Sequence, residues 1–139
     1  MAVISFTADH LRAMRVKAGT AAEVAGSPGF AERMAALGAK TILSAEGTVL
    51  GIMGAVPILP HVAEVFVIAS EDQTSHPVTF AKSVRKELYT LKAKYRRIQS
   101  VSVTDEFHRR WLSWLGFEPE GVMKGYGLDG EDMTIWGLV

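Results

Sequence analysis

Residues 101–121 read VSVTDEFHRRWLSWLGFEPEG and contain the clearest local signals in the chain. The stretch begins with a β-branched segment and continues into Thr104 and Asp105, residue types that cap helices. Apolar residues then recur at helical spacing until Gly116, the residue type at which many helices end. Because a strand-like segment follows directly, we predict a strand–helix–strand unit in this part of the sequence.

Composition favours one folded domain. The 139 residues are 48% hydrophobic and 22% charged, so we expect a single domain over residues 1–139. Cysteine is absent, which excludes disulfides and thiolate metal sites. No apolar run approaches the roughly 20 residues that span a membrane, and the N-terminal residues do not have the pattern of a signal peptide. We therefore expect a cytoplasmic protein with no membrane partner.

Charge is distributed unevenly, although the formal net charge is zero. Residues 82–110 contain nine Lys or Arg against three Asp or Glu, whereas residues 116–139 contain five acidic residues and one lysine. Solvated helix faces are one explanation of the basic segment. The other is an anionic partner, either a nucleotide cofactor or nucleic acid.

Hydrophobic periodicity and turn residues divide the chain into strands and helices. Strands are predicted over residues 2–6, 40–45, 49–58, 62–69, 98–103, 121–126 and 133–139. Helices are predicted over residues 7–17, 28–37, 75–95 and 105–115, and residues 19–29 fit either a helix or a loop. Pro57 and Pro60 are expected to bracket a turn. This order predicts an α/β (α+β) domain whose mixed sheet has about six or seven strands, with about four helices on its two faces.

The same patterns indicate which side chains pack inward. On the second and third predicted helices, the stripes expected to face the core are Phe30, Met34 and Leu37, then Val78, Ala81, Val84, Leu88, Leu91 and Tyr95. Trp111, Trp114 and Trp136 are expected in the core or at its rim. Gly51 and Gly54 lie inside a predicted strand, which indicates a bulge or a close approach of backbone rather than a phosphate loop.

The order of elements, together with Leu115-Gly116-Phe117, resembles the GNAT (GCN5-related N-acetyltransferase) superfamily over essentially the whole chain. The resemblance implies the fold of that family, acetyl-CoA as cofactor and an amine as acetyl acceptor. In the family, a loop of the form Gln/Arg-x-x-Gly-x-Gly/Ala joins a central strand to the long helix. Its backbone amides and the helix N-terminus bind the cofactor pyrophosphate.

The corresponding loop here is SEDQTSHPV over residues 70–78, and it departs from that pattern. Gln73 takes the Gln/Arg place, while His76 and Val78 stand at the two glycine places. Pro77 removes one amide, and an acidic pair precedes Gln73. The cofactor-binding residues implied by the resemblance are Val67, Ile68, Ala69, Gln73, Thr74, Ser75, His76 and Val78, with Asp105 at the place of a family asparagine.

The resemblance also implies the catalytic candidates. Leu112 holds the place at which family members often carry a tyrosine general acid, and leucine cannot donate a proton. The general-base candidates are Glu64, on the strand that usually supplies one, and His108, in the first turns of the last helix. An exposed carboxylate and a surface or capping histidine are the structural alternatives. The four histidines are too scattered to suggest a metal site, so no metal is expected.

About the last 35 residues, with the turn Tyr126-Gly127-Leu128-Asp129-Gly130, resemble more narrowly the GNAT-like proteins of tailed phages and prophages, some of them internal virion proteins. This implies a second hypothesis, a catalytically inactive structural or accessory protein in the host cytoplasm or the virion. Its partner would be a phage virion protein or nucleic acid. The loop without glycine and Leu112 favour this hypothesis, whereas the order of elements does not discriminate.

Overall fold

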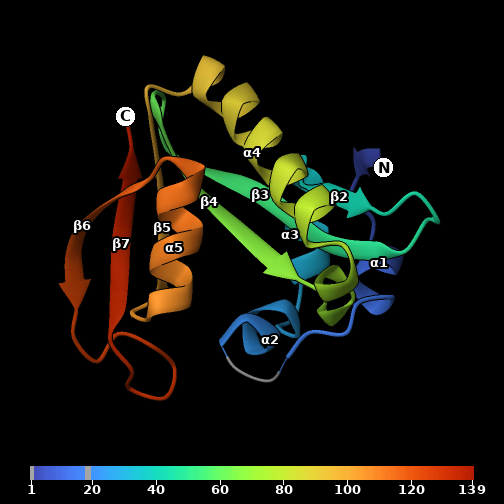
Figure 1. The fold of residues 1–139 in the computed structure, drawn as a ribbon, viewed down its shortest axis with the longest axis horizontal. Coiled ribbons are helices and arrows are strands. Elements are labelled where there is room, and N and C mark those ends of the chain that lie inside the picture. The colour runs from blue at the N-terminus through green and yellow to red at the C-terminus, as the bar shows by residue number, and fades with distance from the viewer. Residues whose placement is uncertain (1, 18–19) are drawn as a thin grey trace. The chain divides into compact units, whose positions relative to one another are not determined.

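The computed structural model describes residues 2–17 and 20–139. Within them, seven strands form one sheet in the order β1-β2-β3-β4-β5-β7-β6 (Figure 1). The strands are β1 (Ala2–Ser5), β2 (Lys40–Leu43), β3 (Val49–Leu59), β4 (Val62–Ala69), β5 (Arg97–Val103), β6 (Glu118–Met123) and β7 (Met133–Leu138). The helices are α1 (Ala8–Arg12), α2 (Thr20–Ala25), α3 (Phe30–Ala36), α4 (Pro77–Lys94) and α5 (Glu106–Leu115), with a short 3₁₀ helix, η1 (Glu71–Ser75).

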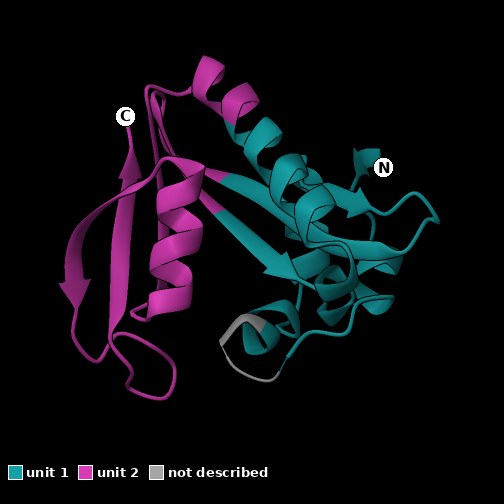
Figure 2. Ribbon diagram, in the orientation of Figure 1, with its two compact units in different colours: residues 1–55, 66–88 teal, residues 56–65, 89–139 magenta. Residues whose placement is uncertain are grey.

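The sheet is mixed, as predicted. β4 and β5 pair in parallel, and β1 with β2, β2 with β3, β5 with β7, and β6 with β7 pair antiparallel. The chain divides into two compact units (Figure 2). Unit 1 consists of Met1–Ala55 and Phe66–Leu88, and unit 2 of Val56–Val65 and Tyr89–Val139. No helix in the described part of the chain is long and apolar enough to cross a membrane.

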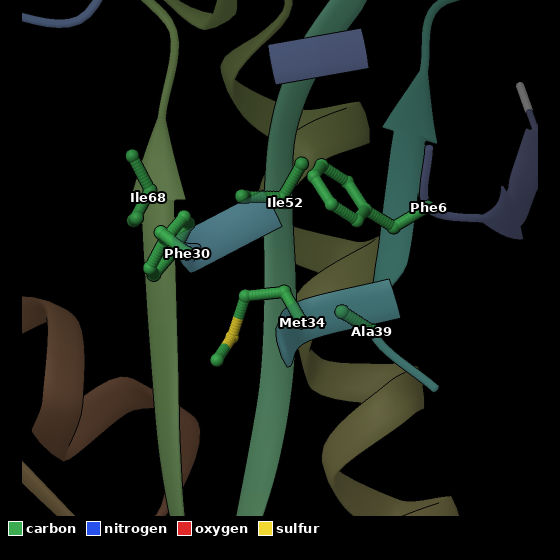
Figure 3. Packing of buried hydrophobic residues seen from close by; sticks show 6 residues of the cluster. All are labelled: Phe6, Phe30, Met34, Ala39, Ile52 and Ile68. Atoms are coloured by element: carbon green, nitrogen blue, oxygen red, sulfur yellow. The ribbon is translucent and has the colours of Figure 1, made fainter. Parts of the chain in front are cut away.

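Unit 1 is built around a hydrophobic cluster on one face of its strands. Side chains from the segment after β1, from α3, from the segment between α3 and β2, and from β3 and β4 meet there (Figure 3). The buried members are Phe6, Phe30, Met34, Ala39, Ile52 and Ile68. On α4, Phe80, Val84 and Leu88 are buried. A Cβ at Gly51 on β3 would lie 2.9 Å from the Ile68 carbonyl oxygen, so the predicted close approach of backbone at this glycine is confirmed. The same Cβ would lie 2.8 Å from the Phe80 ring.

Unit 2 contains parts of β3 and β4, the last turns of α4, and all of β5, α5, β6 and β7. The parallel β4–β5 ladder comprises Val62–Glu64 with Arg97–Gln99, and β7 runs antiparallel to β5 along its whole length. Trp136 on β7 is 3% exposed, and its Nε1 donates a hydrogen bond to Ser102 Oγ at 3.0 Å. The predicted place of Trp136 in the core is therefore confirmed.

α5 begins and ends where the sequence indicates. The Asp105 side chain accepts a hydrogen bond from the His108 amide, and Gly116 closes the helix with φ 103°. The helix buries Leu112 and Leu115, whereas Phe107 is 69% and Trp114 is 45% exposed. The Trp111 and Trp114 rings stack on each other with centroids 6.1 Å apart. The leucines, rather than the exposed aromatic residues, anchor this helix.

Several predicted boundaries and burials were wrong. α1 ends at Arg12 rather than near residue 17, and residues 18 and 19 lie outside the described residues. β3 continues through Pro57 to Leu59, because an edge or strand-end position tolerates the missing N–H. Leu37 and Val78 are exposed, since each lies at the end of its helix, beyond the part that packs on the sheet.

Candidate active site

The loop after β4 is tied to the segment after α1. Ser70 is 1% exposed, and its Oγ accepts hydrogen bonds from the amides of Asp72 at 3.3 Å and Arg15 at 3.2 Å. The Arg15 side chain adds an ion pair to Asp72 at 2.6 Å. The hydrogen bond from Arg15 holds the pKa of Asp72 below its usual range. One of the two negative charges next to the predicted cofactor loop is thus neutralised.

Most amides of this loop are bound within the protein. The Glu71 amide donates to Arg15 O at 2.8 Å, the Gln73 amide to Ser70 O at 3.1 Å and the His76 amide to Gln73 O at 2.9 Å. The Asp72 amide is bonded to Ser70 Oγ and Pro77 has no N–H, so none of these five residues has a free main-chain donor for a phosphate. The amides of Gln73 and His76, predicted to bind the cofactor, are therefore already hydrogen-bonded inside the protein.

The start of α4 is the part of the loop region that fits an anion. The Phe80 amide donates to His76 O at 3.0 Å, so the helical bonds begin there. Val78 and Thr79 in the first turn have amides that helix geometry leaves without an intrahelical acceptor. α4 has 18 residues, and its N-terminus carries a positive partial charge. Amides suited to an anion therefore lie at this helix start rather than in η1.

Glu64 on β4 belongs to a row of four polar side chains in unit 2. Glu64 Oε1 accepts a hydrogen bond from Gln99 Nε2 at 3.1 Å, and Gln99 Oε1 accepts one from Arg97 Nε at 3.1 Å. Arg97 in turn forms two hydrogen bonds with Glu120, at 2.9 and 2.5 Å. These last contacts raise the pKa of Arg97 and lower that of Glu120. The Glu64 carboxylate is thus held rather than loosely exposed.

His108 and Asp105 form a second pair in unit 2. Asp105 Oδ1 lies 2.8 Å from the His108 amide nitrogen and 2.7 Å from His108 Nδ1. Partial burial alone would raise the pKa of Asp105, but these hydrogen bonds hold it below its usual range. When Nδ1 carries the proton, Nε2 is the ring nitrogen left to accept another. Both the capping alternative and a proton-transfer role agree with this geometry.

The predicted site residues fall into both units. Val67, Ile68 and Ala69 end β4 and lead directly into the loop of unit 1, where Thr74 Oγ1 donates to Glu71 O at 2.8 Å. Glu64, Asp105 and His108 belong to unit 2. Leu112 is 6% exposed, so the place of the family tyrosine is part of the core. Among the described residues, no group of three or more His, Cys, Asp or Glu is arranged to hold a metal.

Sequence reasoning missed Arg15, Arg97, Gln99 and Glu120. Arg15 and Asp72 are 57 residues apart, and Arg97 and Glu120 are 23 apart. No local pattern links such positions. The one available signal was the alternation of Arg97 and Gln99, which places them on one face of a strand.

The structure is similar to those of several acetyltransferases. A phosphinothricin acetyltransferase from Sinorhizobium meliloti, solved with AcCoA, matches with a TM-score of 0.77 and 19% identity over 99% of this chain and 86% of that one. A GNAT-family acetyltransferase from Bacillus anthracis matches with a TM-score of 0.74 and 15% identity, over 99% and 93%. A chimera of the Vibrio cholerae spermidine N-acetyltransferase matches with a TM-score of 0.72 and 11% identity, over 99% of this chain and 95% of that one.

No protein-family model and no curated protein matches the sequence. At these low identities the similarity to solved structures concerns the fold. The chain therefore has the fold of the GNAT acetyltransferases, and the predicted fold class is confirmed.

Proposed function

We propose that this chain is an acetyl-CoA-dependent N-acetyltransferase in which Glu64 is the general base. The observation that carries the proposal is the Glu64 carboxylate, which Gln99 holds at 3.1 Å on the parallel β4–β5 pair. The shared fold supports it, because one structure with this fold was solved with AcCoA. The likeness to a spermidine N-acetyltransferase and a phosphinothricin acetyltransferase favours a small amine as acceptor.

The chemistry assigned to the residues is simple. Acetyl-CoA supplies the acetyl thioester when bound. Glu64 takes a proton from the acceptor amine, directly or through a water molecule, so that nitrogen forms a bond to the acetyl carbon as the carbon–sulfur bond breaks. The departing thiolate takes its proton from water, since Leu112 at the place of the family tyrosine cannot supply one. His108, with its ring oriented by Asp105, is the second candidate for the base. One proton leaves nitrogen and one reaches sulfur, so the transfer balances.

The cofactor would lie along the end of β4 and the start of α4. Val67, Ile68 and Ala69 supply main-chain groups for the pantetheine arm. Ser75 and the first-turn amide of Val78 supply donors for the pyrophosphate, and Thr74, whose hydroxyl donates to Glu71 O, lies beside them. The internally bonded amides of Gln73 and His76 make this a weaker anion site than a glycine-rich loop.

Thermal melting with millimolar acetyl-CoA tests the proposal first. At a hundred times the dissociation constant, the ligand stabilises the fold by about 2.7 kcal/mol, a shift of several degrees. Thr74→Glu places a carboxylate before the helix and should remove the shift, whereas Thr74→Ser should keep it.

An assay over a panel of amines that includes spermidine should then show transfer that Glu64→Gln abolishes. No shift, or full activity in Glu64→Gln, would falsify the proposal.

Two observations favour the alternative of an inactive protein with this fold. Leu112 is buried at the place of the family tyrosine, and the loop amides from Glu71 to Gln73 have internal acceptors. Such a protein would be a phage or prophage structural or accessory component, with a virion protein or nucleic acid as partner. It would show neither a melting shift with acetyl-CoA nor acetyl transfer to any amine.

A further inference from the structure

One ion pair in the row of Glu64, Gln99, Arg97 and Glu120 joins two strands that are not neighbours in the sheet. Arg97 lies on β5 and Glu120 on β6, and β7 runs between them in the sheet. The two side chains meet above Gly137 of β7. A Cβ at Gly137 would lie 2.8 Å from Arg97 Nη1 and 2.7 Å from Glu120 Cδ. Gly137 does not have a positive φ, so the missing side chain, not backbone freedom, is what the ion pair requires.

The hydrogen bonds of the row all run one way, because each side chain fixes which atom of the next side chain it can bind. Arg97 has only N–H donors, so its Nε must meet the carbonyl oxygen of the Gln99 side chain. The Gln99 amino group therefore faces Glu64. The two hydrogen bonds from Arg97 to Glu120 fix the plane of the guanidinium group and aim Nε at Gln99. Without that ion pair, the Gln99 amide is free to turn over.

We propose that Gln99, Arg97 and Glu120 are positioning residues for the Glu64 carboxylate, and that Gly137 is the position that lets them act as one row. Gln99 occupies Oε1 of Glu64, which leaves Oε2 to accept the proton of the acceptor amine. No covalent bond changes in the row itself. This inference rests on the proposed role of Glu64 as general base.

Gln99→Leu and Gly137→Ala test the row in the full chain. Leucine removes the hydrogen bond to Glu64, and the new methyl group at residue 137 separates Arg97 from Glu120. Both variants should lower kcat by about tenfold to a hundredfold, since small misplacement of a catalytic group has effects of that size, and leave the KM for acetyl-CoA unchanged. Gly121→Ala on β6 is the matched control, because nothing lies within 4 Å of its Cβ position.

A charge swap separates positioning from mere stabilisation. R97Q and E120Q each break the ion pair, whereas the double variant R97E/E120R restores it with the charges exchanged. A carboxylate at position 97 accepts from the Gln99 amino group, which turns the carbonyl oxygen toward Glu64. We expect the swap to recover the melting temperature but not kcat. Recovery of both would show a structural role only and overturn the inference.

A spectroscopic measurement is independent of activity. The two side-chain N–H resonances of Gln99 should move in E64Q, its direct partner, and also in E120Q, which acts through Arg97. Unmoved resonances in E120Q would overturn the row. If E64Q abolishes transfer while Gln99→Leu and Gly137→Ala keep wild-type kcat, this inference fails and the proposed function stands. If E64Q keeps full activity, the proposed function fails first.

Discussion

Asp105 shows how a single carboxylate caps a helix and binds a histidine ring at once. Its Oδ1 accepts from the His108 amide, one of the first-turn donors that α5 cannot satisfy by itself, and from the His108 ring. The sequence predicted Asp105 as a helix cap and, by resemblance, as a cofactor-binding residue. The cap is confirmed, and cofactor binding stays a prediction.

Removing this cap should weaken the fold. Asp105→Ala leaves the His108 amide without its acceptor, so we expect the free energy of unfolding to fall by about 1 kcal/mol. Asp105→Asn keeps an oxygen at the cap and should lose much less. Urea denaturation of wild type and the two variants measures both effects. Identical midpoints would show that the cap does not contribute to stability.

Glu106 makes stability depend on acidic pH. Its hydrogen bonds to Arg109, and then to Arg110, lower its pKa from 4.5 to about 2. Between these values the unfolded chain takes up a proton that the folded chain does not, so stability falls as the pH decreases through that window. Relative to Glu106→Gln, wild type should have a constant advantage above about pH 5 that disappears near pH 2. Because the pair is exposed, added salt should reduce the advantage.

At the scale of elements, the contact of α4 with β3 depends on one glycine. Phe80 lies over Gly51, where a Cβ would be 2.8 Å from the ring and 2.9 Å from the carbonyl oxygen of Ile68. The ring can shift slightly, but the carbonyl belongs to the neighbouring strand β4 and cannot. The close packing of this helix on unit 1 is therefore set by the absence of a side chain.

Gly51→Ala should consequently destabilise the protein by about 1–3 kcal/mol through overpacking. Gly121→Ala adds the same methyl group in open space on β6 and is expected to change stability little. Thermal or urea unfolding compares the two. A Gly51→Ala variant as stable as the control would mean that the Phe80 contact yields without cost.

At the scale of the whole molecule, the basic segment is less available than its composition indicates. Arg97 pairs with Glu120, and Arg109 and Arg110 both pair with Glu106. The formal net charge of the chain is zero. Both facts weaken the attraction to a polyanion.

We therefore expect no retention of the protein on double-stranded DNA at about 150 mM salt, and weak retention at most at about 20 mM. A column run at both salt concentrations measures this. Binding that persists at the higher concentration and falls steeply with added salt would favour the nucleic-acid alternative instead.

The limits of sequence reasoning are clearest in the loop after β4. The departures of His76 and Val78 from the glycine places could be read directly, because the motif is local. The pairing of Asp72 with Arg15, and the burial of Ser70 between them, depends on two segments that are distant in the sequence. The sequence shows the charge of Asp72 but not the arginine that pairs with it.

The sequence by itself determined the order of strands and helices, the cap and stop of α5 and the fold class, because periodicity, capping residues and turn glycines act over a few residues. Only the tertiary structure decided that Glu64 is held by Gln99 and that Arg97 meets Glu120 above Gly137. These contacts follow from strand order and register across the sheet. A change of one residue in register turns every side chain of a strand to the other face, so no local pattern specifies them.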